Sequence, residues 1–239
     1  MLAPKISIII PTLNEATNIA ALITYLQKNG GESLQEIIVA DAKSDDNTAE
    51  LAAEAGAKIV NAERGRAVQM NTAAAFATGK ILYFVHADTT PPPNFVTQIL
   101  AAYAQNKEAG CFRANLKSNH FLLKINSFCT RFPFMWCRGG DQTLFITKQL
   151  FDELNGFDTQ YRIMEEYDFI RRLKAKTCFY ILKENVLVST RKYEENGYFR
   201  VQIANLLVFN MFRLGFSQES MIKTYKKILN TNGLSWKHS

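Results

Sequence analysis

The sequence predicts an α/β fold in which a parallel sheet occupies the N-terminal half and helices close the chain. Residues 5–107 alternate short, continuous apolar runs with segments of helical apolar spacing, which is the pattern of a parallel sheet covered by helices. Residues 197–229 have helical spacing alone, interrupted at Gly215 and Phe216. With 239 residues and 47% hydrophobic content, the chain suits one large domain or a domain with an appendage.

Strands and helices are expected to alternate through the first half. The apolar runs are short and lack polar alternation, which favours strands buried on both faces. Asn47 with Glu50 forms a capping pair at a helix start, and Gly56 ends that helix. The expected strands are residues 6–10, 37–40, 58–60 and 81–85. The expected helices are residues 16–27, 47–56, 66–79 and 94–107.

The order of elements becomes irregular after residue 107. A strand is expected at 111–116, and an aromatic-rich stretch follows at 120–136. No repeat or low-complexity linker marks a domain boundary. The later elements expected are a helix at 165–174, strands at 178–182 and 186–189, and two helices within 197–229, the second capped by Ser217.

The composition limits the class of partner. The net charge is +6 and the pI is about 9.1, but the Lys and Arg residues are scattered rather than gathered into a run. This distribution favours phosphorylated small molecules or an anionic membrane surface, and it argues against a nucleic-acid partner.

Cysteine spacing and the N-terminus bear on the cellular compartment. The four cysteines form no C-x-x-C pair and have no nearby histidine, so neither zinc nor a disulfide framework is indicated. The apolar run at 6–10 is too short for a signal-peptide core. We therefore expect a cytoplasmic chain with buried, reduced thiols.

Polar side chains follow each of the first strands. The carboxyl ends of parallel strands share one edge of the sheet, where α/β folds bind ligands. For Asp88 alone, which follows the strand at 81–85, a turn-capping role is an equally good interpretation. Several polar strand ends on one edge favour a binding site. The residues concerned are Thr12, Asn14, Glu15, Asp41, Arg64, Arg66 and Asp88.

The residue types at these strand ends suit a nucleotide diphosphate. Arg64 and Arg66 flank Gly65 at a helix start, where free backbone N–H groups and the helix dipole favour phosphate. Alone, the two arginines would be better interpreted as an exposed, solvated turn. Asp41 can accept a hydrogen bond from a base or ribose. Asp88 can hold a divalent cation that bridges diphosphate oxygens.

Five motifs in order resemble those of family 2 inverting glycosyltransferases, which have a GT-A fold. The segments HADT, GDQTLFI and STRKYEENG are also similar to those of a bacterial subgroup labelled arsenosugar-biosynthesis-like glycosyltransferases. The resemblance implies a mixed, Rossmann-like α/β sheet flanked by helices, with a C-terminal helical extension. The motifs are ISIIIPTLNE (6–15), IVADAKSDDNT (38–48), GRAVQMN (65–71), FVHADT (84–89) and MEEYDFIRRL (164–173).

The resemblance implies roles for individual residues. Asp88 would contact the metal, Mg²⁺ or Mn²⁺. Glu166 stands where the family has its catalytic base, with Asp168 as the second choice and Glu165 as a further acid of the same helix. A simpler interpretation is that these acids decorate a helix N-terminus, where negative charge is favourable. The uridine pocket would be lined by Pro11, Asn14, Glu15 and Asp41.

The segment at 136–142 resembles the acceptor side of the family. Trp136 would stack on a sugar, and Asp141 with Gln142 would bind its hydroxyl groups. The aromatic residues that precede this segment, namely Phe128, Phe132 and Phe134, are for the most part expected to pack in the core.

Three positions depart from the family pattern. His86 stands where the first Asp of D-x-D often stands, so the metal would have fewer carboxylates or be held mainly by substrate. Ala42 replaces a second Asp next to Asp41, so base specificity would be looser. Met70 stands where many relatives have Arg, so Arg66 or Arg64 would supply that phosphate contact, and the adjacent Asn71 would bind the nucleotide-sugar donor.

The resemblance also divides the chain. Residues 1–195 would form the GT-A domain, with 1–107 as the nucleotide-sugar-binding half and 108–195 as the acceptor half. Residues 196–239 would be helices packed on the core, on a second subunit in a homodimer, or on a membrane surface. The stretch 199–216 is apolar over nearly all of its helical surface, but its internal charges argue against a membrane span.

The expected reaction is the inverting transfer of a sugar from a nucleotide-diphosphate donor, a UDP-sugar, to an acceptor that the sequence does not identify. One alternative is a nucleotide-sugar-binding protein without turnover. Another is a lipid-phosphate sugar transferase at the membrane surface. A nucleotidyltransferase is a further alternative, but it would have a glycine-rich loop after the first strand, where this chain has PTLNE.

Overall fold

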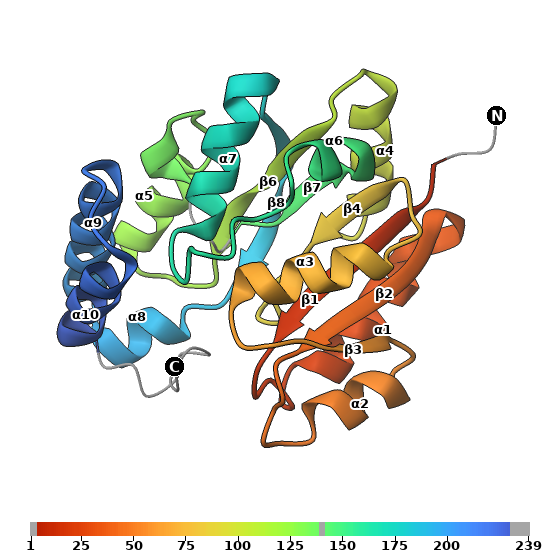
Figure 1. The fold of residues 1–239 in the computed structure, drawn as a ribbon, viewed down its shortest axis with the longest axis horizontal. Coiled ribbons are helices and arrows are strands. Elements are labelled where there is room, and N and C mark those ends of the chain that lie inside the picture. The colour runs from red at the N-terminus through yellow and green to blue at the C-terminus, as the bar shows by residue number, and fades with distance from the viewer. Residues whose placement is uncertain (1–3, 139–141, 230–239) are drawn as a thin grey trace.

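The computed structural model of the protein describes residues 4–138 and 142–229. Its centre is a mixed sheet in the order β3-β2-β1-β4-β7-β6-β8-β5, with helices on both faces (Figure 1). The strands are β1 (Ile6–Thr12), β2 (Leu34–Asp41), β3 (Lys58–Asn61), β4 (Ile81–Phe84), β5 (Thr89–Thr90), β6 (Ala109–Leu116), β7 (Leu144–Thr147) and β8 (Tyr180–Val188). The helices are α1 (Ile19–Gly30), α2 (Thr48–Glu54), α3 (Arg66–Phe76), α4 (Phe95–Ala104), α5 (Phe121–Cys129), α6 (Lys148–Glu153), α7 (Glu165–Lys176), α8 (Arg191–Asn196), α9 (Tyr198–Arg213) and α10 (Gln218–Ile228).

Alternation along β1 divides the hydrophobic core into two layers. Ile8 and Ile10 pack on the side of α1 and α4. Ile9 packs on the side of α3, α6 and α7. All three side chains are fully buried. Because successive strand side chains point to opposite faces, a strand covered on both sides needs an unbroken apolar run.

Strand directions bring the functional loops to one edge of the sheet. β1, β2, β3 and β4 are parallel. β7 runs antiparallel to both β4 and β6, and β8 runs parallel to β6. The Ser189 N–H donates to the Asp88 carbonyl (3.3 Å), which joins the loop after β4 to the end of β8. The carboxyl ends of β4 and β8 therefore meet at the same edge as those of β1 and β2.

The predicted elements of the first half are confirmed in kind and order. β1 extends to Thr12, beyond the predicted residues 6–10. α1 begins at Ile19 rather than Ala16. The cause is a turn in which the N–H groups of Asn18 and Ile19 both donate to the Glu15 carbonyl at 3.0 Å.

The second half contains elements that the sequence patterns did not predict. α5 forms within the aromatic-rich stretch, β7 and α6 precede the predicted helix, and α8 follows β8. The two strands expected at 178–182 and 186–189 are one strand, β8. The expectation of buried thiols is wrong for Cys178, which is exposed, although all four cysteines are free thiols.

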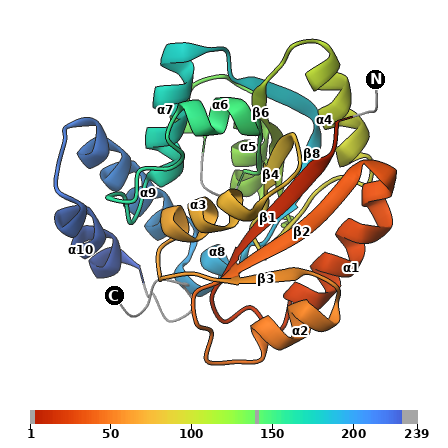
Figure 2. The same cartoon turned by 45° about the vertical axis from the view of Figure 1, so that its right-hand side comes forward.

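The last two helices pack together at the end of the sheet far from α1 and α2 (Figure 2). Their shared core includes Val208 of α9 and Met221 of α10, and Met164 packs against it. Ser217 caps α10 as predicted, since its hydroxyl accepts from the Ser220 N–H at 3.3 Å. In the part of the chain that the structure describes, no helix has both the length and the apolar character needed to cross a membrane.

Candidate active site

Hydrogen bonds to Asp41 join the loops after β1 and β2. Its carboxylate is 2% exposed and accepts hydrogen bonds from the Thr12 hydroxyl (3.0 Å) and from the Ser44 N–H and hydroxyl (2.8 and 2.6 Å). The Asn14 N–H donates to the Ser44 hydroxyl at 2.9 Å, and the Asn14 side-chain oxygen accepts from the Asp45 N–H at 2.8 Å. Asn14 has a φ of 56°, in the left-handed region that asparagine tolerates. This edge of the sheet is therefore preformed.

Gln69 of α3 holds the same two strand ends. The residue is 5% exposed, and its side-chain amide donates to the carbonyl oxygens of Thr12 (2.8 Å) and Ala40 (2.9 Å). Buried carbonyl groups require hydrogen-bond partners. One amide thus satisfies two strands and ties α3 to both of them.

Glu15 joins the loops after β1, β4 and β8. Its carboxylate lies 3.6 Å from the Arg191 guanidinium and accepts a hydrogen bond from the Asn18 amide at 3.0 Å. Burial raises the pKa of Glu15, and the Asp88 carboxylate adds to this rise, while Asn18 and Arg191 oppose it. The structure therefore brings Glu15, Asp88 and Arg191 together at one place on the sheet edge.

The start of α3 lies between this edge and α7. Gly65, with a φ of 136°, adopts a backbone conformation that favours glycine, and α3 begins at the next residue. The Arg64 guanidinium lies 3.8 Å from Asp45, on the side of the β2 loop. The Arg66 guanidinium lies 4.0 Å from the Glu165 carboxylate, on the side of α7. Both side chains are partly exposed.

Two acids at the start of α7 face the end of β4. Glu166 Oε1 lies 3.4 Å from His86 Nε2, and Glu165 lies beside Arg66. Met164, with a φ of 68°, precedes both acids, so they occupy the first turn of α7. The helix dipole favours negative charge there. Among the described residues, no donor forms a hydrogen bond with Glu166 Oε1.

Burial and charge separate the acidities of the two carboxyl groups. Burial, with the charge of Glu166 beside it, raises the pKa of Glu165 well above its ordinary value of 4.5. Burial also acts to raise the pKa of Glu166, but His86 and Arg66 outweigh it and lower that pKa to about 2. Glu166 is therefore the ionised member of the pair at neutral pH.

Asp168 and Asn71 have structural partners instead of an open position. Asp168 accepts hydrogen bonds from Arg171 and Arg172, both at 2.8 Å. The Asn71 amide donates to the Phe157 carbonyl (2.7 Å) and accepts from the Phe157 N–H (2.9 Å). We therefore do not retain Asp168 as the second-choice base or Asn71 as a donor-binding residue.

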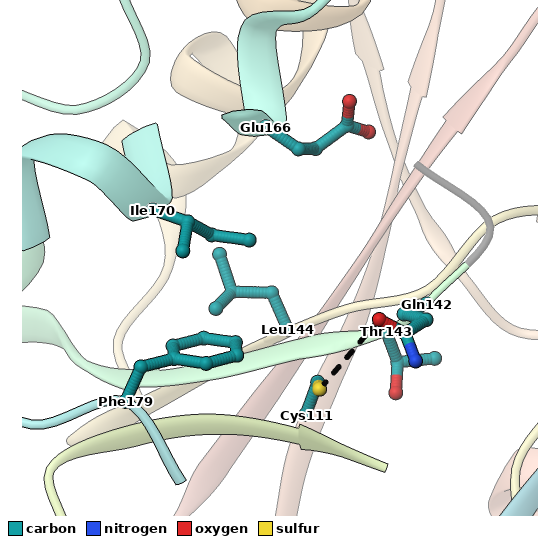
Figure 3. A pocket seen from close by; sticks show the side chains of 7 residues that line it. All are labelled: Cys111, Gln142, Thr143, Leu144, Glu166, Ile170 and Phe179. Atoms are coloured by element: carbon teal, nitrogen blue, oxygen red, sulfur yellow. Dashed lines mark hydrogen bonds between the residues drawn. The ribbon is translucent and has the colours of Figure 1, made fainter. Parts of the chain in front are cut away.

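On the acceptor side, the structure places Gln142 near Glu166 but leaves Trp136 outside. Both Gln142 and Glu166 line a small pocket with residues of β6, β7 and α7 (Figure 3). Gln142 is 8% exposed, and its side-chain nitrogen has no hydrogen-bond partner among the described residues. Trp136 does not line this pocket and stacks on Phe134 with ring centroids 5.6 Å apart. Asp141 lies outside the described residues.

The aromatic residues before Trp136 are not core residues. Phe128, Phe132 and Phe134 are 50%, 39% and 53% exposed, so the expectation that most of them pack in the core is wrong. The reason is that α5 packs on β6 through other side chains such as Leu123, which is 4% exposed.

The residues present fit a divalent cation that is shared with a ligand. Asp88 is exposed, and its carboxylate accepts one long hydrogen bond, from the Thr89 hydroxyl at 3.4 Å. Within residues 4–138 and 142–229, no group of three or more His, Cys, Asp and Glu side chains is placed to hold a metal ion. Mg²⁺ is often bound through one or two carboxylates together with substrate phosphates. A cation at Asp88 would need such phosphates.

Sequence reasoning missed two residues of this edge. Ser44 lies in the polar turn after β2, where several side chains could serve equally well as hydrogen-bond partners. Gln69 carried a clearer signal, because it is a polar residue on the buried side of α3 with Ala67, Met70 and Ala73. A buried amide on an apolar helix face indicates a backbone partner.

Replacing Gln69 by Met tests the role of the amide. The change keeps the length of the side chain but leaves two buried carbonyl oxygens without a donor, so we expect the free energy of unfolding to fall by about 2–4 kcal/mol. Urea unfolding followed by circular dichroism measures this loss. Gln149→Met is the control, because Gln149 is exposed on α6 and its change should stay within about 0.5 kcal/mol. Equal stability of the two variants would contradict the assigned role.

Comparison with known proteins gives two curated relatives. Over 105 residues the chain is 31% identical to glucosyl-3-phosphoglycerate synthase of Mycolicibacterium smegmatis, a match that covers 40% of this chain and 35% of that protein. An uncharacterized glycosyltransferase of Haemophilus influenzae is 24% identical over 192 residues, covering 75% of this chain and 65% of that protein. The chain thus spans less than two thirds of the length of either relative.

Solved structures confirm the predicted GT-A fold. Glucosyl-3-phosphoglycerate synthase of Mycobacterium tuberculosis, solved with Mn²⁺, UDP and glucosyl-3-phosphoglycerate, has a TM-score of 0.59 at 20% identity and covers 89% of this chain and 81% of its own. TarS of S. aureus, residues 1–349 with UDP, has a TM-score of 0.64 at 16% identity and covers 98% and 75%. A family model described as glycosyl transferase family 2 matches residues 7–152, more than half of the chain, so the chain belongs to that family.

Proposed function

We propose that the protein transfers a sugar from a UDP-sugar to an acceptor hydroxyl by a single inverting displacement, with Glu166 as the base. One observation carries the proposal. The ionised carboxylate of Glu166 lies 3.4 Å from His86, which precedes Asp88 by two residues, and the Arg66 guanidinium lies 4.0 Å from the neighbouring acid Glu165. This arrangement supports a site in which Glu166 would be the base, Asp88 would bind a cation and Arg66 would bind phosphate.

The donor would bind across the carboxyl ends of β1, β2 and β4. Its nucleoside would lie on the preformed edge, where Pro11 and Asp41 are buried and Asn14 is held by Ser44. Its diphosphate would lie toward Gly65 at the start of α3, where Arg64 and Arg66 supply positive charge. Support also comes from the structural neighbours, two of which were solved with UDP.

The chemical step needs a base with an ionised oxygen. The acceptor oxygen forms a bond to the anomeric carbon of the sugar while its proton passes to a Glu166 oxygen. The bond from the anomeric carbon to the diphosphate oxygen breaks, and its electron pair leaves with UDP. Arg64 and Arg66 stabilise the negative charge that develops on the diphosphate. Gln142, which lines the same pocket as Glu166 and whose side-chain nitrogen has no hydrogen-bond partner among the described residues, would orient the acceptor.

A divalent cation held by Asp88 and the donor phosphates would neutralise charge on the departing diphosphate. Two structures of one neighbour support this choice, because the mycobacterial synthase was solved with Mn²⁺ and UDP and also with Mg²⁺ and UDP.

Two other functions make different predictions about products. A nucleotide-sugar-binding protein without turnover would release no UDP from its donor. A nucleotidyltransferase would release pyrophosphate. The ionised carboxylate beside His86 favours transfer over binding alone, because a pure binding site has no use for a buried base.

Replacing Asp88 by Asn tests the cation site. The variant keeps the size of the side chain but removes the negative charge, so we expect the Mn²⁺-dependent part of UDP affinity to disappear while the fold remains intact. Isothermal titration with UDP, with and without Mn²⁺, measures this. Asp152→Asn on α6 is the matched control, because Asp152 is exposed and belongs to a surface pair with Lys148. Unchanged Mn²⁺ dependence in the Asp88 variant would show that the cation is held elsewhere.

Replacing Glu166 by Gln tests the base. The variant should bind UDP with wild-type affinity and lose transfer by at least about 100-fold, the usual contribution of a general base. The measurement is UDP release from a panel of UDP-sugars and acceptors, with Glu153→Gln on α6 as the control. If the Glu166 variant transfers sugar at the wild-type rate, another residue is the base.

Replacing His86 by Gln tests how the base is kept ionised. His86 acts with Arg66 against burial to lower the pKa of Glu166 to about 2 from the ordinary 4.5, so the loss of His86 should raise that pKa and move the acid limb of the kcat/KM profile to higher pH. Activity should then fall between pH 7 and pH 4 in the variant more steeply than in the wild type. His120→Gln is the control, since His120 is exposed and stacks on Tyr198. Superimposable profiles would rule out this role of His86.

A further inference from the structure

The outer face of α9 is apolar and has nothing packed on it in the described chain. Val201, Ala204 and Val208 form the inner face and are fully buried. Phe199, which is 71% exposed, lies on the opposite side of the helix with Ile203 (53%) and Leu206 (62%). A surface helix normally places polar residues on its solvent side. The outer face of α9 therefore requires a partner.

The outer face of α5 has the same character. Phe121, Ile125 and Phe128 recur at helical spacing and are 73%, 42% and 50% exposed. Aromatic contacts extend this face from Phe128 to Phe132, with ring centroids 5.8 Å apart. We call the surface made by Phe121, Ile125, Phe128, Phe199, Ile203 and Leu206 the α5–α9 face.

Direct contacts join the two helices. The Tyr198 hydroxyl at the start of α9 donates to the Asn126 side-chain oxygen of α5 at 3.1 Å. The Tyr198 ring stacks on His120, with centroids 5.7 Å apart. Exposed apolar side chains from both helices thus belong to one region, larger than the scattered single residues that soluble surfaces carry.

The charged residues of the two segments that carry the α5–α9 face are all basic. Residues 117–138 and 197–217 contain no Asp or Glu, although the whole chain has 22 acidic residues. The same two segments carry exposed basic side chains along both helices. These are Lys117, Lys124, Arg131, Arg200 and Arg213.

We propose that the α5–α9 face docks on an anionic lipid bilayer. Apolar side chains bordered by Lys and Arg, without acidic residues, match the boundary between acyl chains and anionic headgroups. A second copy of this chain is a poorer partner, because a two-fold interface would place the same basic residues opposite one another without a neutralising acid. α9 also contacts the helix that bears Glu166, since the rings of Tyr167 and Phe209 lie 5.4 Å apart.

The test is co-sedimentation of the full chain with vesicles. We expect binding to vesicles of equal parts phosphatidylglycerol and phosphatidylcholine, and at least about tenfold weaker binding to pure phosphatidylcholine. The double variant Phe199→Ser and Leu206→Ser should lose vesicle binding, because it removes two apolar side chains that would be buried among the acyl chains. The double variant Lys124→Glu and Arg200→Glu should lose it through charge, again by at least about tenfold.

Matched controls come from other faces of the molecule. Phe76→Ser removes an aromatic ring that is 51% exposed on α3, and Lys28→Glu reverses an exposed charge on α1. Both controls should bind vesicles like the wild type. Thermal unfolding and UDP affinity, measured on every variant, separate docking from folding and from the function proposed above, because vesicle binding needs no donor.

Three results would overturn the proposal. One is the absence of binding to phosphatidylglycerol vesicles by a folded chain. Another is normal vesicle binding by the Phe199 and Leu206 double variant. The third is a wild-type protein that does not bind vesicles and forms a dimer in sedimentation velocity without lipid, while the double variant is a monomer. The α5–α9 face would then join two copies of the chain.

Discussion

The direction of β7 is the constraint on which the arrangement of the site depends. β7 lies between β4 and β6 and runs against both, so its two neighbours end at the same edge of the sheet. β7 itself ends at the opposite edge and continues into α6 there. After α6 the chain returns to the edge at which β4 ends, and α7 begins there with Glu166 beside His86. A β7 parallel to its neighbours would put the start of α7 at the wrong end of the sheet.

The positive charges beside Glu165 and Glu166 determine which of these two acids is ionised. Burying two carboxyl groups in one helical turn costs free energy, and the cost is larger if a buried charge has no compensating group. Arg66 and His86 approach from different elements and stand beside different acids of the pair. Because the two acids titrate together, the proton held by one leaves the other ionised. The helix dipole also favours the ionised carboxylate, because both acids lie in the first turn of α7.

Sequence reasoning predicted the first half well because its signals are local. Continuous apolar runs such as 6–10 and the glycine at Gly65 report burial and backbone conformation directly. It did less well after residue 107, where β7 and α6 are short and derive their structure from neighbours distant in sequence. Among the site residues, Asp41 and Glu166 could be found from motifs. The structural role of Asp168 could not, because it depends on Arg172 reaching the loop at Leu154 and Gly156.

The bond pair between Asn71 and Phe157 has a mechanical consequence. Asn71 lies on α3, which begins with Arg66, and the loop at Phe157 leads toward α7, which bears Glu165 and Glu166. Gly156 allows this close approach, since a Cβ there would lie 2.6 Å from the Asn71 oxygen. These two hydrogen bonds therefore fix the position of α3 relative to the loop that precedes α7. In a chimaeric protein, α3, this loop and α7 would have to be transplanted as a single module.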